Sequence, residues 1–350
     1  MQAWQVTRYG SPTEALELRA VPEPEPGDGE ILVRTTASVL NYNEVDGCHG
    51  RYLTINPALP FTLGMECVGE VVAAGAGAES WIGRRVTASG RGGTGAHAEL
   101  VVGATAMAFE APDQLTDTEA AAFFYPFHLA YLGLHERGRL AAGETVLVHA
   151  AAGGVGSAAV QLAAAAGARV FATVGSDDKA ALVTDLGAEL VVNYRTDDFV
   201  SRVLDETKGQ GVDVCFDGVG GRTMMRSLEC LARGGRHLCV GFAAGIEAEE
   251  VPMVSGRTLC FGNFDLLGVI LAYVEPDLLS YVGDFVPVPV PRFNPPTTEI
   301  GRQVQERLVE MLTAGTIHPV VGATVPFEGL PVALEEMEAR RTVGRTVVTR

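Results

Sequence analysis

The sequence predicts an α/β protein in which a doubly wound parallel sheet accompanies a second, β-rich part. From Glu144 to about residue 265, short apolar strand-like runs alternate with helix-like runs, which is typical of a parallel sheet with crossover helices. Residues 1 to about 120 instead contain short β-like runs separated by Gly and Pro. The length of 350 residues suggests about two domains.

The first part of the chain has the pattern of short strands joined by tight loops. Residues 22–27 alternate Pro with Glu and end in Gly, which indicates a stiff loop. The pattern changes near Asp117, and helices are expected over 116–122 and 127–137. Strands are expected over 2–7, 30–37, 69–74 and 85–88.

The alternating part begins with an apolar run at 146–150, as in a strand buried on both faces of a parallel sheet. An Ala-rich helix is expected over 157–166, where Gly167 stops it. Further strands are expected over 169–174, 190–193, 212–216 and 236–241, and further helices over 178–186, 199–207 and 223–231.

The alternation fades after about residue 265. Five prolines between 287 and 296 exclude a central strand or a helix there. Beyond them, helices are expected over 302–314 and within 327–340, and a final strand over 345–349.

Composition limits the class of protein. The net charge of −17 argues against nucleic-acid binding, because clustered Lys and Arg bind phosphate backbones. An apolar fraction of 47% allows a sizeable core and excludes wholesale disorder. The sequence starts without a secretory pattern, and no long apolar run indicates a membrane span. The six cysteines form no C-x-x-C pair, so we expect reduced thiols in a cytoplasmic protein.

The most informative motif joins the first strand and helix of the alternating part. Residues 151–156 have a G-x-G-x-x-G pattern with Ala at its first position. The second Gly lets backbone approach a pyrophosphate, the third lets helix and strand pack closely, and the helix N-terminus attracts phosphate. An ordinary Gly-rich turn is the alternative, but the strand–turn–helix context favours a dinucleotide. The expected contacts are Ala152, Gly153, Gly154, Val155 and Gly156.

The second strand of this part indicates which dinucleotide is bound. An NAD-selective site usually places Asp or Glu there, on the ribose 2′-hydroxyl. Here the strand ends in the small, neutral Ser176, which leaves room for a 2′-phosphate. Lys179 and Tyr194 follow within reach of the same group, whereas the acidic pair at 177–178 argues against a phosphate unless it caps the helix toward solvent. The combination favours NADPH.

Several motifs together resemble one family over nearly the whole chain. They lie at 41–44 (NYNE), 50–52 (GRY), 63–69 (LGMECVG), 150–156, 173–176 with Lys179, 187–188, 193–195, 213–221 and 340–347. With these motifs the chain resembles the zinc-independent quinone oxidoreductases, the ζ-crystallin-like branch of the medium-chain dehydrogenase/reductase superfamily.

The resemblance implies an architecture. Residues 1–122 and 268–350 would form a GroES-like catalytic domain around a Rossmann NADPH-binding domain formed by 123–267. A homodimer is also expected, commonly by edge pairing of Rossmann sheets. The Pro-rich segment over 282–298 looks like an insertion, and its length favours a wall of the cleft over a dimer contact or a neutral excursion.

The resemblance also implies roles for single residues. Lys179, Tyr194 and Arg340 match positions that bind the adenine-ribose phosphate. Gly241 and Phe242 fall where the last strands of the sheet meet the cofactor.

No metal site is expected. Relatives that bind zinc use Cys, His and Glu ligands near the cleft and a separate four-Cys lobe. Met65 stands in the place of the ligand His, and Asn43 lies near the place of the first ligand Cys. No Cys occurs between Cys67 and Cys215, so the four-Cys lobe is missing.

The expected reaction is hydride transfer from NADPH to a small-molecule quinone or conjugated enone. Asn41 and Tyr52 are the candidates to stabilise charge on the acceptor oxygen, each with a structural role as the alternative. The proton would come from water, from Tyr52, or from Asp46 through water. Two other functions stay open: an enoyl-thioester (enoyl-CoA) reductase, which needs a basic channel for its carrier, and a catalytically silent, crystallin-like NADPH-binding protein.

Overall fold

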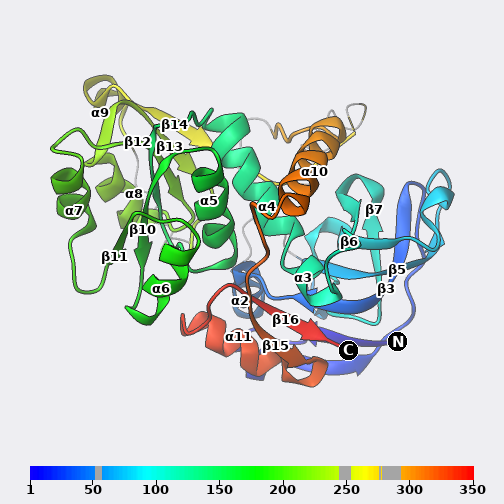
Figure 1. The fold of residues 1–350 in the computed structure, drawn as a ribbon. Helices are drawn as coiled ribbons and strands as arrows, with labels where there is room; N and C mark the ends of the chain where they lie inside the picture. Colours follow the sequence, from blue (N-terminus) through cyan, green and yellow to red (C-terminus); the bar gives the residue numbers. More distant parts are fainter. Residues whose placement is uncertain (52–56, 244–253, 276, 278–292) are drawn as a thin grey trace. The chain divides into compact units, whose positions relative to one another are not determined.

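The computed structural model describes residues 1–51, 57–243, 254–275, 277 and 293–350. The chain forms two compact units. Both chain ends lie in the first unit (Figure 1). The first unit comprises Met1–Phe124, Ala272–Gln305 and Pro319–Arg350, and the second comprises Tyr125–Leu271 and Glu306–His318.

The first unit is rich in β-structure. Its larger sheet has the strand order β15-β16-β3-β5-β6-β8, with β7 paired to β3, and its smaller sheet has the order β2-β1-β4. The bounds of the larger sheet are β3 Glu30–Val39, β5 Glu66–Ala74, β6 Arg85–Ser89, β7 Leu100–Ala104, β8 Ala108–Glu110, β15 Val321–Pro326 and β16 Arg345–Thr349. Those of the smaller sheet are β1 Gln2–Val6, β2 Leu16–Ala20 and β4 Phe61–Thr62.

Short helices surround these strands. One apolar cluster fills the space between α2, α11 and the smaller sheet, with Trp4, Val45, Leu63 and Leu334 among its buried residues. The helices are α1 Pro12–Ala15, α2 Tyr42–His49, η1 Glu79–Trp81, η2 Arg91–Gly93, η3 Thr105–Met107, α3 Asp117–Ala121, η8 Phe327–Gly329 and α11 Leu330–Glu338.

The second unit is built on a six-stranded sheet in which every neighbouring pair is parallel. The strand order is β11-β10-β9-β12-β13-β14, so the first strand of the unit is central and the order reverses beside it, as in a doubly wound dinucleotide-binding sheet. The bounds are β9 Thr145–Val148, β10 Arg169–Val174, β11 Leu190–Asn193, β12 Val212–Asp217, β13 Leu231–Cys239 and β14 Asp265–Gly268. All four residues of β9 are buried, as expected for a strand covered on both faces.

Helices cover both faces of this sheet: α5 lies on one side, and α7 and α8 lie on the other (Figure 1). A buried apolar cluster joins α7 to the sheet and includes Leu147, Phe171, Val203 and Cys215. The helices are α4 Phe124–Tyr131, the π-helix η4 Leu132–Arg137, α5 Gly154–Ala165, α6 Asp178–Asp185, α7 Phe199–Glu206, α8 Gly221–Leu228, α9 Gly256–Gly262 and α10 Thr298–Thr313, which begins in the first unit.

The predicted fold class, a parallel doubly wound sheet with a separate β-rich part, is confirmed. Some elements differ from the prediction. The helix expected over 223–231 ends at Leu228, and β13 begins at Leu231, which pairs with Val212; the register then shifts, so that Val214 pairs with Arg236. The helix expected over 127–137 changes from α to π geometry at Leu132. Most of the 282–298 segment lies outside the described residues.

Candidate functional site

The turn between β9 and α5 has the geometry of a phosphate-binding turn. Gly153 is the N-cap of α5, and its N–H donates to the carbonyl oxygen of Ala150 at 3.0 Å. A Cβ atom on Gly156 would lie 2.2 Å from the same oxygen. Only glycine therefore lets the helix approach the turn this closely.

The start of α5 offers backbone donors. Helix geometry leaves the N–H groups of its first turn, those of Gly154, Val155 and Gly156, without intrahelical acceptors. The same end carries the positive pole of the helix dipole. No acidic side chain lies in this first turn, and Ala152 just before it is buried. These residues fit a pyrophosphate, which needs donors and positive potential close to backbone.

Two neutral residues, Gly175 and Ser176, follow the end of β10. A Cβ atom on Gly175 would lie 2.7 Å from the hydroxyl oxygen of Tyr194, so the Tyr194 ring reaches across this glycine. Tyr194 follows β11, and its N–H donates to the carbonyl oxygen of Val174 at 3.0 Å. Its side chain remains 42% exposed, which leaves the ring accessible to a ligand.

The two acids that follow β10 are engaged by neighbours. Asn193 Nδ2 donates to Asp177 Oδ1 at 2.8 Å, and a hydrogen bond from the Ser176 side chain lowers the pKa of Asp178. The Lys179 N–H donates to the carbonyl oxygen of Ser176 at 3.2 Å, which places Lys179 in the first turn of α6. Ser176, Lys179 and Tyr194 thus gather where β10 and β11 end.

The ends of β12 and β13 approach each other through glycine. The Gly241 N–H donates to the carbonyl oxygen of Asp217 at 3.2 Å, and a Cβ atom on Gly241 would lie 2.6 Å from the carbonyl oxygen of Gly218. Phe242 follows with an exposed side chain. Gly241 and Phe242 therefore lie at the same carboxyl edge of the sheet as the turn before α5.

Asp217 is buried beneath this edge. Its Oδ1 accepts the N–H groups of Val219 and Gly220 at 2.7 and 3.0 Å, and its Oδ2 lies 3.3 Å from His237 Nε2. Burial opposes ionisation of this carboxyl, but the His237 ring and the peptide donor hold its pKa below the usual value. A charged Asp217 thus orders the loop after β12.

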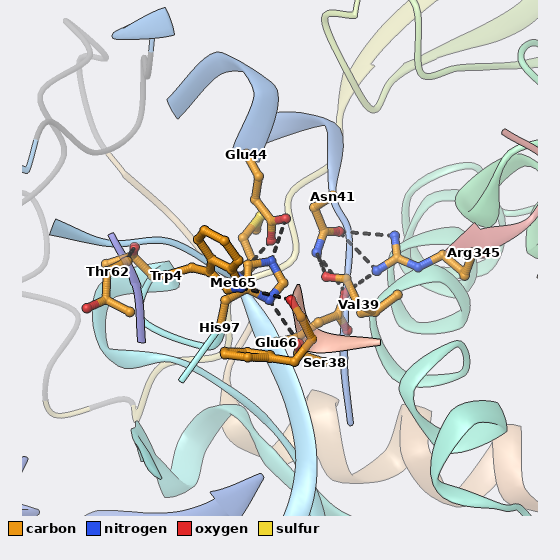
Figure 2. Close-up of polar contacts among 12 residues, drawn as sticks. Trp4, Ser38, Val39, Asn41, Glu44, Thr62, Met65, Glu66, His97 and Arg345 are labelled. Atoms are coloured by element: carbon orange, nitrogen blue, oxygen red, sulfur yellow. Dashed lines mark hydrogen bonds and ion pairs between the residues drawn. The ribbon is translucent and has the colours of Figure 1, made fainter. Parts of the chain in front are cut away.

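In the first unit, Asn41 belongs to a buried polar network (Figure 2). Its Nδ2 donates to Glu66 Oε1 at 3.1 Å and to the Val39 carbonyl oxygen at 3.3 Å. Its Oδ1 accepts hydrogen bonds from both terminal nitrogens of Arg345, each at 3.1 Å. Arg345 also forms an ion pair with Glu66. Both amide hydrogens of Asn41 are therefore directed at protein acceptors, which matches the structural alternative for this residue.

A second buried network lies beside the first (Figure 2). Glu44 accepts the Met65 N–H on Oε1 at 3.0 Å, and its Oε2 lies 2.9 Å from His97 Nε2. The other ring nitrogen of His97 is 2.9 Å from Ser38 Oγ. Sequence reasoning missed this network, because nothing local pairs Glu44 with a histidine 53 residues away.

Three other expected site residues belong to the first part of the chain or to its last residues: Asp46, Tyr52 and Arg340. Asp46 is buried in α2 with Oδ1 3.4 Å from Arg51 Nε. Tyr52 lies outside the described residues. Arg340 belongs to the first unit, just after α11, and has a left-handed backbone with φ of 58°.

Among the described residues, no group of three or more His, Cys, Asp or Glu side chains is arranged to hold a metal ion. Cys48 and Cys67 are free thiols, and burial raises the pKa of each to about 12. His49, the neighbour of Cys48, pairs with Glu338 at 2.8 Å. Within the described part of the chain, no helix combines the length and apolar character needed to cross a membrane.

Comparisons with known proteins place this fold and turn in one family. Residues 27–113 match the alcohol dehydrogenase GroES-like domain, and residues 154–283 match the family described as zinc-binding dehydrogenase. Among solved structures, a mycobacterial protein complexed with NADPH is 31% identical, with a TM-score of 0.84 and full coverage of both chains. A quinone oxidoreductase of Pseudomonas syringae pv. tomato DC3000 is also 31% identical, with a TM-score of 0.82, over 100% of this chain and 99% of that one.

Further similarities extend to other reductases and to large synthases. The CurK enoyl reductase is 25% identical, with a TM-score of 0.79, over 99% of this chain and 98% of that one. A phenolphthiocerol/phthiocerol polyketide synthase polypeptide of Mycobacterium tuberculosis is 40% identical over 233 residues, 65% of this chain. The chain spans only about a tenth of the length of that synthase polypeptide.

These similarities define the class of protein as an oxidoreductase of two-domain dehydrogenase architecture. The chain belongs to the medium-chain dehydrogenase/reductase superfamily, as a member of the quinone oxidoreductase-like group.

Proposed function

We propose that the chain is an NADPH-dependent, zinc-independent reductase that delivers a hydride to a quinone or a conjugated enone. The observation that carries this proposal is the composition of the carboxyl edge of the parallel sheet. There the open N-terminus of α5 adjoins a strand, β10, that ends without a free acid and is followed by Lys179 and Tyr194. The solved relative with NADPH supports the same cofactor.

Each group at this edge has a distinct task in the proposal. The N–H groups of residues 154–156 bind the pyrophosphate, since backbone donors at a helix start favour anions. Lys179 and Tyr194 bind the ribose 2′-phosphate, and Arg340 joins them by its match to the family motif. Asn193 and Ser176 hold the carboxylates of Asp177 and Asp178, and the Asp178 carboxylate also interacts with the charge of Lys179. NADPH, when bound, supplies a hydride from its nicotinamide ring.

The substrate end of the site needs a donor for charge that develops on the acceptor oxygen. We keep Tyr52 as the candidate donor. Asn41 instead orients the network of Glu66 and Arg345, because its amide hydrogens are used there. Asp46 remains the candidate proton source through water, although it lies buried beside Arg51.

The cofactor assignment is tested by replacing Lys179. Lys179→Ala removes a charge-assisted contact to phosphate, so NADPH affinity should fall about tenfold or more while NADH affinity stays within about twofold. Lys208→Asn is the matched control, because Lys208 precedes β12 at the opposite edge of the sheet and its left-handed backbone tolerates Asn. Calorimetric titration measures all four affinities. An equal loss for both cofactors would remove Lys179 from the phosphate site.

An enoyl-thioester reductase is the second candidate, favoured by the similarity to an enoyl reductase. The two functions are separated by NADPH oxidation with benzoquinone and with crotonyl-CoA. Turnover of the thioester alone would refute the quinone assignment. Tight NADPH binding without oxidation by any quinone, enone or thioester would instead support a catalytically silent binding protein.

We further propose that two copies associate through β14, the last strand of the sheet order. Among the described strands β14 pairs only with β13, and an open edge can accept another strand. Phe261 just before it is 87% exposed. Light scattering should give twice the chain mass of 36.8 kDa, and Phe261→Asp should shift the mass toward one copy. A single-chain mass for the unaltered protein would refute the dimer.

A further inference from the structure

Ala150, at the start of the proposed phosphate-binding turn, has an unusual backbone. Its φ is 51°, in the left-handed region that side chains with a Cβ atom rarely adopt. The conformation matters because it aims the Ala150 carbonyl oxygen at the helix start. That oxygen accepts the Gly153 N–H at 3.0 Å and lies against Gly156. The shape of the turn therefore depends on Ala150 staying in this conformation.

One residue of the neighbouring strand holds the chain on both sides of Ala150. The carbonyl oxygen of Thr173 accepts the Ala151 N–H at 3.1 Å. The hydroxyl of the same residue lies 2.9 Å from Nδ1 of His149. Thr173 and His149 are both buried, so water does not replace these contacts readily. A strained residue persists where its surroundings over-determine it, and Thr173 supplies two such constraints.

The direction of the hydrogen bonds follows from the far side of the His149 ring. The Ser227 hydroxyl donates to the Thr223 carbonyl oxygen at 2.7 Å, so its 2.7 Å contact with Nε2 of His149 uses the ring N–H. Nδ1 is then an acceptor, and the Thr173 hydroxyl donates to it. Burial lowers the pKa of His149 to about 4; His237 lowers it further, and Asp217 raises it by less than burial lowers it. The ring is therefore neutral at neutral pH.

We propose that Thr173 is a positioning residue of the cofactor site: by fixing His149 and Ala151 it holds Ala150 in the left-handed conformation and keeps the start of α5 shaped for the pyrophosphate. This inference rests on the proposed dinucleotide function of the turn. It adds a residue that binds no cofactor atom in the proposal and acts through two neighbours of the turn.

A double-mutant cycle between Thr173 and Ala150 tests the proposal. Thr173→Val keeps the side-chain shape but leaves Nδ1 of His149 buried without its donor, so the dissociation constant for NADPH should rise about tenfold. Glycine adopts the left-handed conformation without strain. In the Ala150→Gly background the same Thr173→Val change should therefore raise the dissociation constant less than about threefold. Thr173→Ser, which retains the hydroxyl, should stay near the unaltered protein.

Thr207→Val is the matched control. The Thr207 hydroxyl is also buried and bonded, to the carbonyl oxygen of Val203 at 2.8 Å and the N–H of Gly211 at 2.9 Å, but it precedes β12 at the other edge of the sheet. This change should lower the urea midpoint of unfolding and leave NADPH affinity unchanged. The same pattern in Thr173→Val would reduce Thr173 to a stabilising residue and overturn the proposal.

Two further outcomes are decisive. Losses of NADPH affinity that simply add in the Thr173→Val, Ala150→Gly double variant would overturn the proposal, because then Thr173 does not act through Ala150. If the unaltered chain binds neither NADPH nor NADH, the proposed function fails and the positioning role with it. The unfolding free energies of the four proteins then still decide whether Thr173 holds Ala150: coupling between the two changes supports the contact, and additivity refutes it.

Discussion

The neutral, buried state of His149 predicts that the second unit loses stability in mild acid. His149 is fully enclosed between Thr173 and Ser227, which bond its two ring nitrogens. The titratable groups that face it are Asp217, which raises the pKa of the ring, and His237, which lowers it. Burial outweighs Asp217 and lowers the pKa of His149 from 6.5 to about 4.

The sign and size of the effect follow from proton linkage. Between pH 6.5 and about 4, the unfolded chain binds a proton at His149 and the folded chain does not. The free energy of unfolding therefore falls as the pH falls through this window, by about 1.4 kcal/mol per pH unit. Over the full interval the free energy of unfolding falls by about 3 kcal/mol, and above pH 6.5 the stabilisation from the neutral ring is fully present.

The assay compares the unaltered protein with His149→Gln, which keeps one donor and one acceptor but does not titrate. Urea unfolding followed by circular dichroism from pH 7.5 to 5 gives the free energy of unfolding of each. Carboxylates away from His149 contribute equally to both proteins, and Asp217, which faces the ring, has a lowered pKa below this pH range, so the difference between the curves isolates His149. The unaltered protein should lose about 2 kcal/mol more than the variant by pH 5. Parallel curves, or a His149 ring proton that titrates near pH 6.5 by NMR, would refute the reasoning.

Three other perturbations have defined outcomes. Gly156→Ala places a methyl group 2.2 Å from a carbonyl oxygen of the turn. The change should lower the free energy of unfolding by about 1–3 kcal/mol and lower NADPH affinity, measured by titration, more than tenfold. Unchanged affinity would remove the turn from the site. Glu66→Gln leaves the buried Arg345 without a counter-charge and should cost about 3–5 kcal/mol by urea unfolding, whereas exposed Glu70→Gln on the same strand should cost little. Cys260 is the one exposed thiol among the six. Titration of the native protein with an aromatic disulfide should therefore show one fast-reacting thiol, and the Cys260→Ser variant should show none. Two or more fast-reacting thiols would contradict the described packing.

Local signals in the sequence predict much of the second unit. The strands over 169–174 and 190–193 agree with β10 and β11, because each is a short apolar run bounded by a glycine or a polar turn. The turn before α5 is also local, since strand, glycines and helix follow one another directly. By contrast β14 was not expected: its four residues, Asp265–Gly268, are half-exposed and gain their strand geometry from pairing with β13.

The polar networks of the first unit depend on contacts that no local pattern contains. Asn41 precedes α2 and is a natural N-cap residue type, yet its side chain makes no cap bond. Its amide instead meets Arg345, 304 residues further along the chain, because β16 pairs with β3. The role of Asn41 is thus decided by strand pairing across the unit, which the sequence pattern around residue 41 does not reveal.

The carboxylates of the first unit's buried networks and the backbone donors at the start of α5 differ in how fully protein groups pair them. Glu44 and Glu66 each receive two or more protein donors inside the first unit. A buried charge that is so enclosed stabilises packing, and removing one partner is costly.

At the start of α5, by contrast, helix geometry leaves backbone donors with no partner in their own helix. Such donors gain most when an anion arrives, because they lose no existing protein hydrogen bond. Changes in the first unit's networks should therefore lower unfolding free energy more than NADPH affinity. Changes that move the α5 turn should have the opposite ratio, and a Glu66→Gln variant that lost NADPH affinity without losing stability would contradict this division.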